Sequence, residues 1–158
     1  IEWQIVGNGN GLDNLMKLIY KYKLENYIKI HKNISDTNLK EIYLNSSVFI
    51  MPSHFGIKKN GFASGEGFGI VYLEAAFAGK PSIACKLGGQ TDLVIDKKNG
   101  ILVDPNTKSV SEAIYTYFKS HVLVENHGRE ARLIAEKKFS KKVFEQDLLN
   151  SLKYFNIF

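Results

Sequence analysis

Two carboxylates lie close together in a glycine-rich segment near the middle of the chain. Glu66 and Glu74 are separated by seven residues within Gly65–Ala75. The apolar period that begins after Gly69 predicts a helix, so Glu66 lies in the loop before the helix and Glu74 lies between one and two turns inside it. The two acids can therefore contact different parts of one elongated ligand.

The start of this predicted helix offers a second kind of ligand contact. Its first backbone N–H groups have no partner within the helix, and the helix dipole favours negative charge there, as on a phosphate. Carboxylates accept hydrogen bonds from the hydroxyl pairs of a sugar or ribose. Together these groups suit a sugar nucleotide. Two solvated acids near a helix start are an equally weighted interpretation, because the dipole favours acids there without any ligand.

A second glycine-rich segment follows the first predicted strand. Gly7-Asn8-Gly9-Asn10-Gly11 joins that strand to a helix, and such a turn lets the backbone approach a phosphate. The dinucleotide fingerprint would need its third glycine where Leu12 stands, so a nicotinamide-dependent oxidoreductase is disfavoured. A tight turn without a ligand explains this segment equally well.

Short apolar runs alternate with amphipathic stretches along the chain, which predicts an α/β fold with a doubly wound parallel sheet in one domain over residues 1–158. The predicted strands are Trp3–Val6, Tyr27–Ile30, Val48–Met51, Ser82–Cys85 and Ile101–Val103. The predicted helices are Leu12–Tyr22, one capped by Ser35 or Asp36, Gly69–Ala78, a short one through Leu93 and Ile95, one from Ser109, Val122–Lys138, and a last one capped by Ser140. Residues His54–Gly65 are predicted to form a loop, in which His54 has no assigned role.

Composition narrows the classes of partner. The 158 residues are 44% hydrophobic and carry a formal net charge of +5, which suits one domain with a polyanionic ligand. The lysines are scattered without the interleaved aromatic residues of a nucleic-acid groove, so no nucleic-acid partner is expected. Cys85 is the one cysteine and is interpreted as a core residue in a reducing, cytoplasmic setting. No metal-ligand spacing and no apolar run of bilayer length is visible.

The segment from Glu66 to Glu74 resembles the Glu-x7-Glu signature of the group 1 glycosyltransferases, the glycogen-synthase-like retaining family. Weaker resemblances follow in register over nearly the whole chain, at Ile5–Gly9, Phe49–Ser53, Ala78–Pro81, Gly88-Gly89 and Asn99–Val103. Asp92 departs from the family pattern, which has a glutamate there after a proline. The segment His54–Gly65 is also longer than in the shortest members.

The resemblance implies a Rossmann-like domain, the C-terminal half of a two-domain glycosyltransferase-B fold. The family's first strand and helix of this domain and its acceptor domain would lie outside residues 1–158, so we expect these residues alone not to catalyse transfer. It also implies a hexosyltransferase that moves a sugar from a GDP- or UDP-linked donor with retention, in bacterial surface polysaccharide or glycolipid synthesis. No cofactor is implied, since the main task is to stabilise charge on the departing diphosphate. A lipid-linked acceptor would bring the protein to the inner face of the membrane.

By the same resemblance, Glu66 is the catalytic-site residue on the hydroxyls of the donor sugar and Glu74 holds the ribose. The implied donor site is completed by Gly7, Gly9, Lys32, Asn33, Ile34, Gly67, Phe68, Gly69, Ile70 and Val71. Two other functions stay open: a sugar-nucleotide epimerase of the same fold, and a non-catalytic subunit that binds nucleotide sugars.

Overall fold

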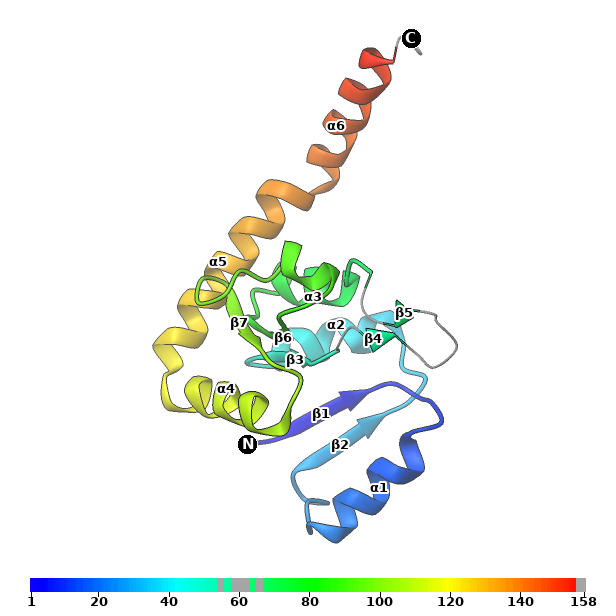
Figure 1. The fold of residues 1–158 in the computed structure, drawn as a ribbon, viewed down its shortest axis with the longest axis vertical. Coiled ribbons are helices and arrows are strands. Elements are labelled where there is room, and N and C mark those ends of the chain that lie inside the picture. Colours follow the sequence, from blue (N-terminus) through cyan, green and yellow to red (C-terminus); the bar gives the residue numbers. More distant parts are fainter. Residues whose placement is uncertain (54–55, 58–62, 65–66, 156–158) are drawn as a thin grey trace. The chain divides into compact units, whose positions relative to one another are not determined.

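The computed structural model describes residues 1–53, 56–57, 63–64 and 67–155 (Figure 1). They fall into two compact units, an N-terminal unit of Ile1–Asn45 and a C-terminal unit of Ser46–Phe158. Parallel strands alternate with helices in both units, which confirms the predicted α/β class. The prediction of a single domain over the whole chain stays a prediction. No helix in the described part of the chain is both long and apolar enough to cross a bilayer.

The N-terminal unit is built on one pair of parallel strands. Its elements are β1 (Trp3–Val6), α1 (Leu12–Lys21), β2 (Ile28–His31) and α2 (Asp36–Asn45). The last residues of the two strands, Val6 and His31, are opposite each other in the register. Ser35 caps α2, because its Oγ accepts a hydrogen bond from the backbone N–H of Asn38 at 3.2 Å.

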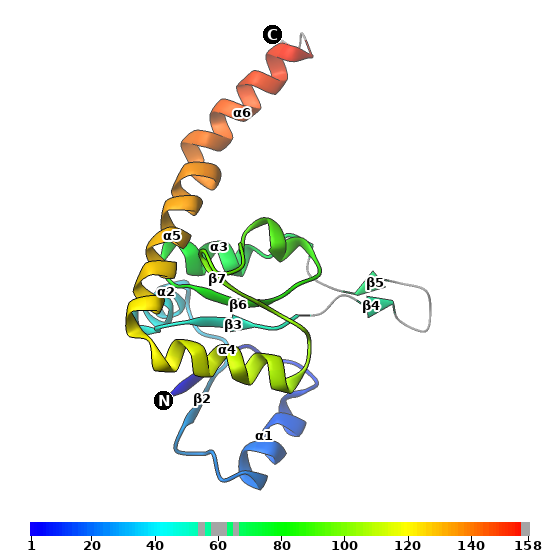
Figure 2. The same ribbon diagram turned by 60° about the vertical axis from the view of Figure 1, so that its left-hand side comes forward.

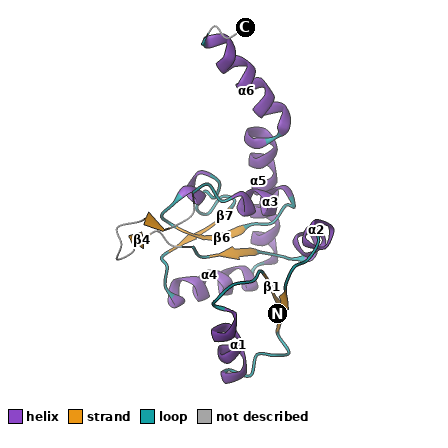
Figure 3. Ribbon diagram, turned by 90° about the vertical axis from the view of Figure 1, so that its right-hand side faces the viewer, coloured by secondary structure: helices purple, strands orange, loops and turns teal. Residues whose placement is uncertain are grey.

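The C-terminal unit contains a three-stranded parallel sheet in the order β3-β6-β7. The strands are β3 (Phe49–Met51), β6 (Ser82–Cys85) and β7 (Gly100–Val103), and the helices are α3 (Ile70–Phe77), the 3₁₀ helix η1 (Gly89–Asp92), α4 (Thr107–Lys119), α5 (His121–Phe139) and α6 (Lys141–Tyr154). Figures 2 and 3 show α3 and α4 on opposite faces of this sheet. This is the doubly wound arrangement that the strand–helix alternation predicts.

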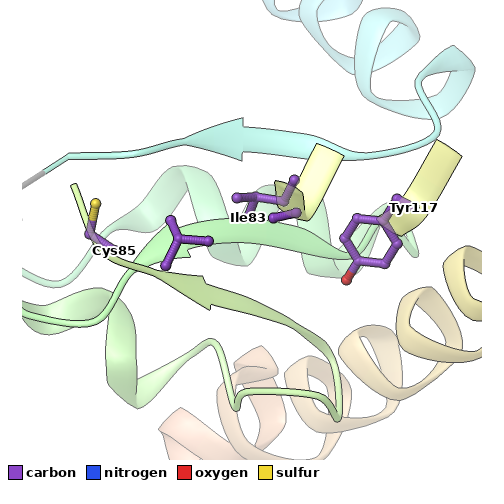
Figure 4. Close-up of a cluster of buried hydrophobic side chains, with 5 residues drawn as sticks. Ile83, Cys85 and Tyr117 are labelled. Carbon is purple, nitrogen blue, oxygen red and sulfur yellow. The ribbon is translucent and has the colours of Figure 1, made fainter. Parts of the chain in front are cut away.

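Alternate residues of β6, the central strand, pack into two different hydrophobic clusters. Ile83 and Cys85 pack with Tyr117 of α4 in one cluster, which Figure 4 shows in close-up. Ala84 points to the other face and packs with Tyr72 of α3. All four residues of β6 are buried, as expected for a parallel strand covered by helices on both sides. The interpretation of Cys85 as a core residue is confirmed, since its exposed fraction is 1%.

Several local predictions were wrong. The segment predicted to be a loop contains a short antiparallel ladder between β4 (Gly56–Ile57) and β5 (Ala63–Ser64). Two-residue strands are too short to produce a readable alternation. Helix α4 is capped by Asn106 rather than Ser109, and the side-chain oxygen of Asn106 accepts a hydrogen bond from the Ser109 N–H at 2.9 Å. The short helix after Gly88 ends at Asp92, before Leu93 and Ile95.

A buried histidine ties helices α4 and α5 together. Nδ1 of His127 lies 2.9 Å from the hydroxyl oxygen of Tyr117, and His127 is 6% exposed. Burial lowers the pKa of His127, although a hydrogen bond with the Lys97 backbone and the charge of Asp96 act in the opposite direction. Burial, with a smaller contribution from Asp96, raises the pKa of Tyr117. The pair is therefore neutral in the folded protein near pH 7.

We expect the free energy of unfolding to fall as the pH drops below about 6.5, the ordinary pKa of histidine. Below that pH the unfolded chain binds a proton that native His127 resists, so acid favours unfolding, while stability is fully retained above it. Urea unfolding at pH 7.5 and pH 5.5 measures this effect. His127→Gln should show a shallower pH dependence than the wild type. Equal slopes for His127→Gln and the wild type would contradict the assignment.

Candidate functional site

The carboxyl ends of the three strands in the C-terminal unit meet at one edge of the sheet. Met51, Cys85 and Val103 end β3, β6 and β7, which run parallel. The loops after β6 and β7 are linked by an ion pair between Lys86 Nζ and Asp104 Oδ2 at 3.1 Å. Ligands of open α/β sheets bind at this edge. Burial, and secondly the charge of Asp104, raises the pKa of the Cys85 thiol, which makes it a poor nucleophile.

Helix α3 begins at this edge because a buried tyrosine attaches it to β3. Tyr72 is 1% exposed, and its hydroxyl donates a hydrogen bond to the carbonyl oxygen of Met51, the last residue of β3. Its ring meets that of Phe49 edge-on, with centroids 5.3 Å apart. Gly69 precedes the helix with a φ of 85°, so the chain turns sharply into its first residue, Ile70. The positive end of α3 is thus placed at the carboxyl edge of the sheet.

Glu74 lies on the exposed face of α3, where the sequence places it. It comes four residues after Ile70, so the two residues share one helix face. Ile70 and Phe77 on that face are 64% and 38% exposed, whereas Tyr72 and Ala75 face the core. The carboxylate of Glu74 is therefore on the solvent side, one turn from the helix start.

The backbone before α3 is in direct contact with the turn after β6. A Cβ atom added to Gly89 would lie 1.6 Å from the carbonyl oxygen of Gly67 and 3.0 Å from Cα of Phe68. Only glycine permits this approach. The ring of Phe68 in turn lies edge-on to the ring of Phe139 of α5, with centroids 5.7 Å apart. The turn at Gly88-Gly89 thus supports the loop that leads into α3.

The N-terminal unit brings together its own set of predicted residues. The Gly7 N–H donates to the carbonyl oxygen of His31 at 3.0 Å, so the turn after β1 lies beside the loop after β2. Gly7 and Gly9 have φ values of 151° and 157°, which favour glycine, and added Cβ atoms would meet nothing within 4 Å. The backbone there is open to a ligand. In the neighbouring loop, Lys32 and Asn33 are exposed and Ile34 is half-buried.

The predicted donor residues therefore form two groups, one in each unit. Gly7, Gly9 and residues 32–34 share an edge of the N-terminal unit, and residues 67–74 lie at the carboxyl edge of the C-terminal unit. Glu66 and His54 lie outside the described residues, and the role of Glu66 stays a prediction. No cluster of three or more possible metal ligands occurs within the ranges that the structure describes.

Sequence reasoning missed two residues that shape the site. Tyr72 could have been found, because a tyrosine inside an otherwise apolar helix needs a partner for its hydroxyl when it is buried. Gln90 could not, because nothing in its sequence position distinguishes it from an ordinary polar turn residue. Its side chain is nonetheless fully buried in the turn after β6.

Comparison with known proteins identifies the family. A model described as glycosyl transferases group 1 matches residues 1–134. The chain is 30% identical over 146 residues to the alpha-1,3/1,6-mannosyltransferase ALG2 of Dictyostelium discoideum, covering 92% of this chain and 32% of that protein. It is 35% identical over 113 residues to a sucrose-phosphate synthase of Zea mays, covering 69% of this chain and 10% of the relative. The chain thus spans about a third or less of these curated relatives.

Solved structures agree on the fold. Alr3699/HepE of Anabaena in complex with UDP superimposes with a TM-score of 0.80 at 24% identity, over 98% of this chain and 41% of that one. A glycosyltransferase from Rickettsia africae gives a TM-score of 0.78 at 25% identity, over 98% and 40% of the two chains. The fold is the Rossmann-like one of the glycosyltransferase-B architecture. The chain belongs to the group 1 glycosyltransferase family.

Proposed function

We propose that the protein transfers a sugar from a nucleotide diphosphate sugar to an acceptor with retention of configuration, and that residues 1–158 bind the donor. Membership of the family supports a glycosyltransferase. The observation that carries the donor site is the attachment of α3 to β3 through Tyr72, which puts the start of the helix at the carboxyl edge with Glu74 exposed on the same helix.

In this proposal each group acts on a different part of the donor. The positive end of α3, with the backbone of Ile70 and Val71, stabilises the charge that develops on the departing diphosphate. The carboxylate of Glu74 accepts hydrogen bonds from the ribose hydroxyls. Glu66 orients the transferred sugar, together with the backbone N–H groups of Gly67, Phe68 and Gly69. Gly7, Gly9 and residues 32–34 of the N-terminal unit stay predicted donor contacts, on the family resemblance alone.

The donor and the setting are also part of the proposal. A relative named as a mannosyltransferase favours a GDP-linked hexose, while a neighbour solved with UDP keeps UDP-sugars open. We expect the acceptor to belong to bacterial surface polysaccharide or glycolipid synthesis. A cytosolic location agrees with the lone, buried Cys85. A lipid-linked acceptor would bring the protein to the inner face of the membrane.

A thermal-shift panel of GDP-mannose, UDP-glucose, UDP-N-acetylglucosamine and ADP-glucose, each beside its nucleoside diphosphate, tests donor binding. A donor present at about 100 times its Kd stabilises the folded state by roughly 2.7 kcal/mol. For a protein of this size that corresponds to a rise in Tm of roughly 5–10 °C. If no nucleotide sugar raises Tm, the proposed donor site is wrong.

The reaction is tested by incubating the protein with the donor that binds, with and without candidate acceptors. Nuclear magnetic resonance of the anomeric proton should show the donor's configuration kept in the product. An inverted product contradicts retention. Release of an isomerised sugar without acceptor favours an epimerase, and donor binding without any reaction favours a non-catalytic subunit.

We propose further that residues 1–158 alone bind donor without transferring its sugar. The matches cover 32% of the mannosyltransferase relative and 41% of the Anabaena structure. A radiolabelled-donor assay on this segment should give transfer at background level while calorimetry still detects the nucleotide. Transfer above background would contradict this part of the proposal.

A further inference from the structure

The turn between β6 and η1 is held by a buried amide. Gln90 has an exposed fraction of 0%. Its Nε2 donates to the carbonyl oxygens of Cys85 at 3.0 Å and of Leu87 at 2.7 Å. Two carbonyl acceptors require the NH₂ group on this side, which fixes the orientation of the amide. The side chain therefore bridges the end of β6 and the turn that follows it.

The oxygen of the same amide faces the glycines of the turn. Oε1 has no hydrogen-bond partner among the described residues. A Cβ atom added to Gly88 would lie 2.5 Å from it, and Gly88 has a φ of 121°. Gln90 thus occupies the space that a side chain at position 88 would need. The next residue, Gly89, makes the close backbone contact with Gly67.

These contacts form one continuous stack from the sheet to the loop at Gly67–Gly69 that leads into α3. Gln90 is fixed to the last residue of β6, packs against Gly88, and so sets the position of Gly89 against Gly67 and Phe68. A shift of the turn would therefore move the backbone of Gly67 and Phe68, whose N–H groups the proposed function places on the transferred sugar.

The helix that carries Glu74 is attached independently. Tyr72 bonds to Met51 and packs on Phe49, and neither contact involves the turn after β6. Ala75 is also fully buried. Displacing the turn should consequently affect the loop before Gly69 much more than the helix after it.

We propose that Gln90 is a positioning residue for recognition of the transferred sugar, acting through the Gly88-Gly89 turn on the loop at Gly67. This inference rests on the proposed function and deepens it. The turn after β6 then determines the affinity for the transferred sugar, and α3 determines the affinity for the nucleotide. A substitution that only destabilised the fold would lower both affinities alike.

Calorimetric titration with the donor and with its nucleoside diphosphate, at a temperature where circular dichroism shows each variant folded, tests the proposal. Gln90→Met keeps the volume of the side chain and removes both donated hydrogen bonds. We expect it to weaken binding of the nucleotide sugar about tenfold, with the affinity for the nucleoside diphosphate unchanged within about twofold. Thr91→Val is the milder second variant, because it removes a hydrogen bond to the Gly88 carbonyl oxygen at 2.9 Å. It should shift the ratio of the two affinities in the same direction.

Ile83→Val is the control for stability, since it trims the core of β6 away from the turn and should lower Tm without changing either affinity. Equal weakening of both ligands in Gln90→Met and Thr91→Val, or no weakening of either, would overturn the assignment while leaving the proposed function intact. Failure of the wild type to bind any nucleotide sugar would overturn both.

Discussion

Replacing Gly89 by alanine is expected to displace the loop at Gly67–Gly69 that leads into α3. The added Cβ would lie 1.6 Å from the Gly67 carbonyl oxygen and 2.4 Å from its carbonyl carbon, so the backbone of one segment must move. Overpacking of this kind costs about 1–3 kcal/mol in stability. We expect the displaced loop to lower the affinity for nucleotide sugar by more than about tenfold. Urea unfolding and calorimetric titration of the purified variant measure the two effects.

The matched control lies on the other side of the same contact. A Cβ atom added to Gly67 would meet nothing within 4 Å, and its φ lies outside the region that favours glycine. Gly67→Ala should therefore leave stability within about 0.5 kcal/mol of the wild type. If Gly89→Ala is as stable as Gly67→Ala and binds the nucleotide sugar as tightly as the wild type, the turn does not support the loop.

Replacing Glu74 by alanine is expected to weaken nucleotide binding without unfolding the protein. The side chain is exposed on α3, so its removal creates no cavity. Hydrogen bonds from ribose hydroxyls to a carboxylate contribute about 1.5–3 kcal/mol. The expected increase in Kd for the nucleoside diphosphate is therefore roughly 10–100-fold. Calorimetry gives the Kd, and the melting curve without ligand checks the fold.

Glu112→Ala is the control for Glu74→Ala. Glu112 is an exposed glutamate of α4, the helix on the other face of the sheet, and its ion pair with Lys108 is long at 4.0 Å. Its removal should not change the Kd. An unchanged Kd in Glu74→Ala would exclude this carboxylate from the nucleotide site.

Two strands have the bounds that the sequence predicts. Trp3–Val6 and Ser82–Cys85 are short β-prone runs, and each ends shortly before a glycine-containing turn. The start of α4 was misplaced since both Asn106 and Ser109 are good N-caps, and only the structure shows which side chain accepts the hydrogen bond.

Local sequence patterns also predicted part of the site. A glycine-rich segment before an apolar helix indicates an anion-binding helix start, and the spacing to Glu74 sets the helix face. The contact between Gly67 and Gly89 joins residues far apart in sequence, and local patterns carry no information about such pairs. The hydrogen bonds of Gln90 depend on that tertiary contact and are equally invisible.

The central claim is that Glu66 and Glu74 hold different parts of one donor, the sugar and the nucleotide. Calorimetric titration of Glu66→Ala and Glu74→Ala, each with the nucleotide sugar and with the nucleoside diphosphate alone, tests it most directly. We predict that Glu74→Ala weakens both ligands to the same extent, whereas Glu66→Ala weakens only the nucleotide sugar. Wild-type affinity for both ligands in both variants would contradict the claim.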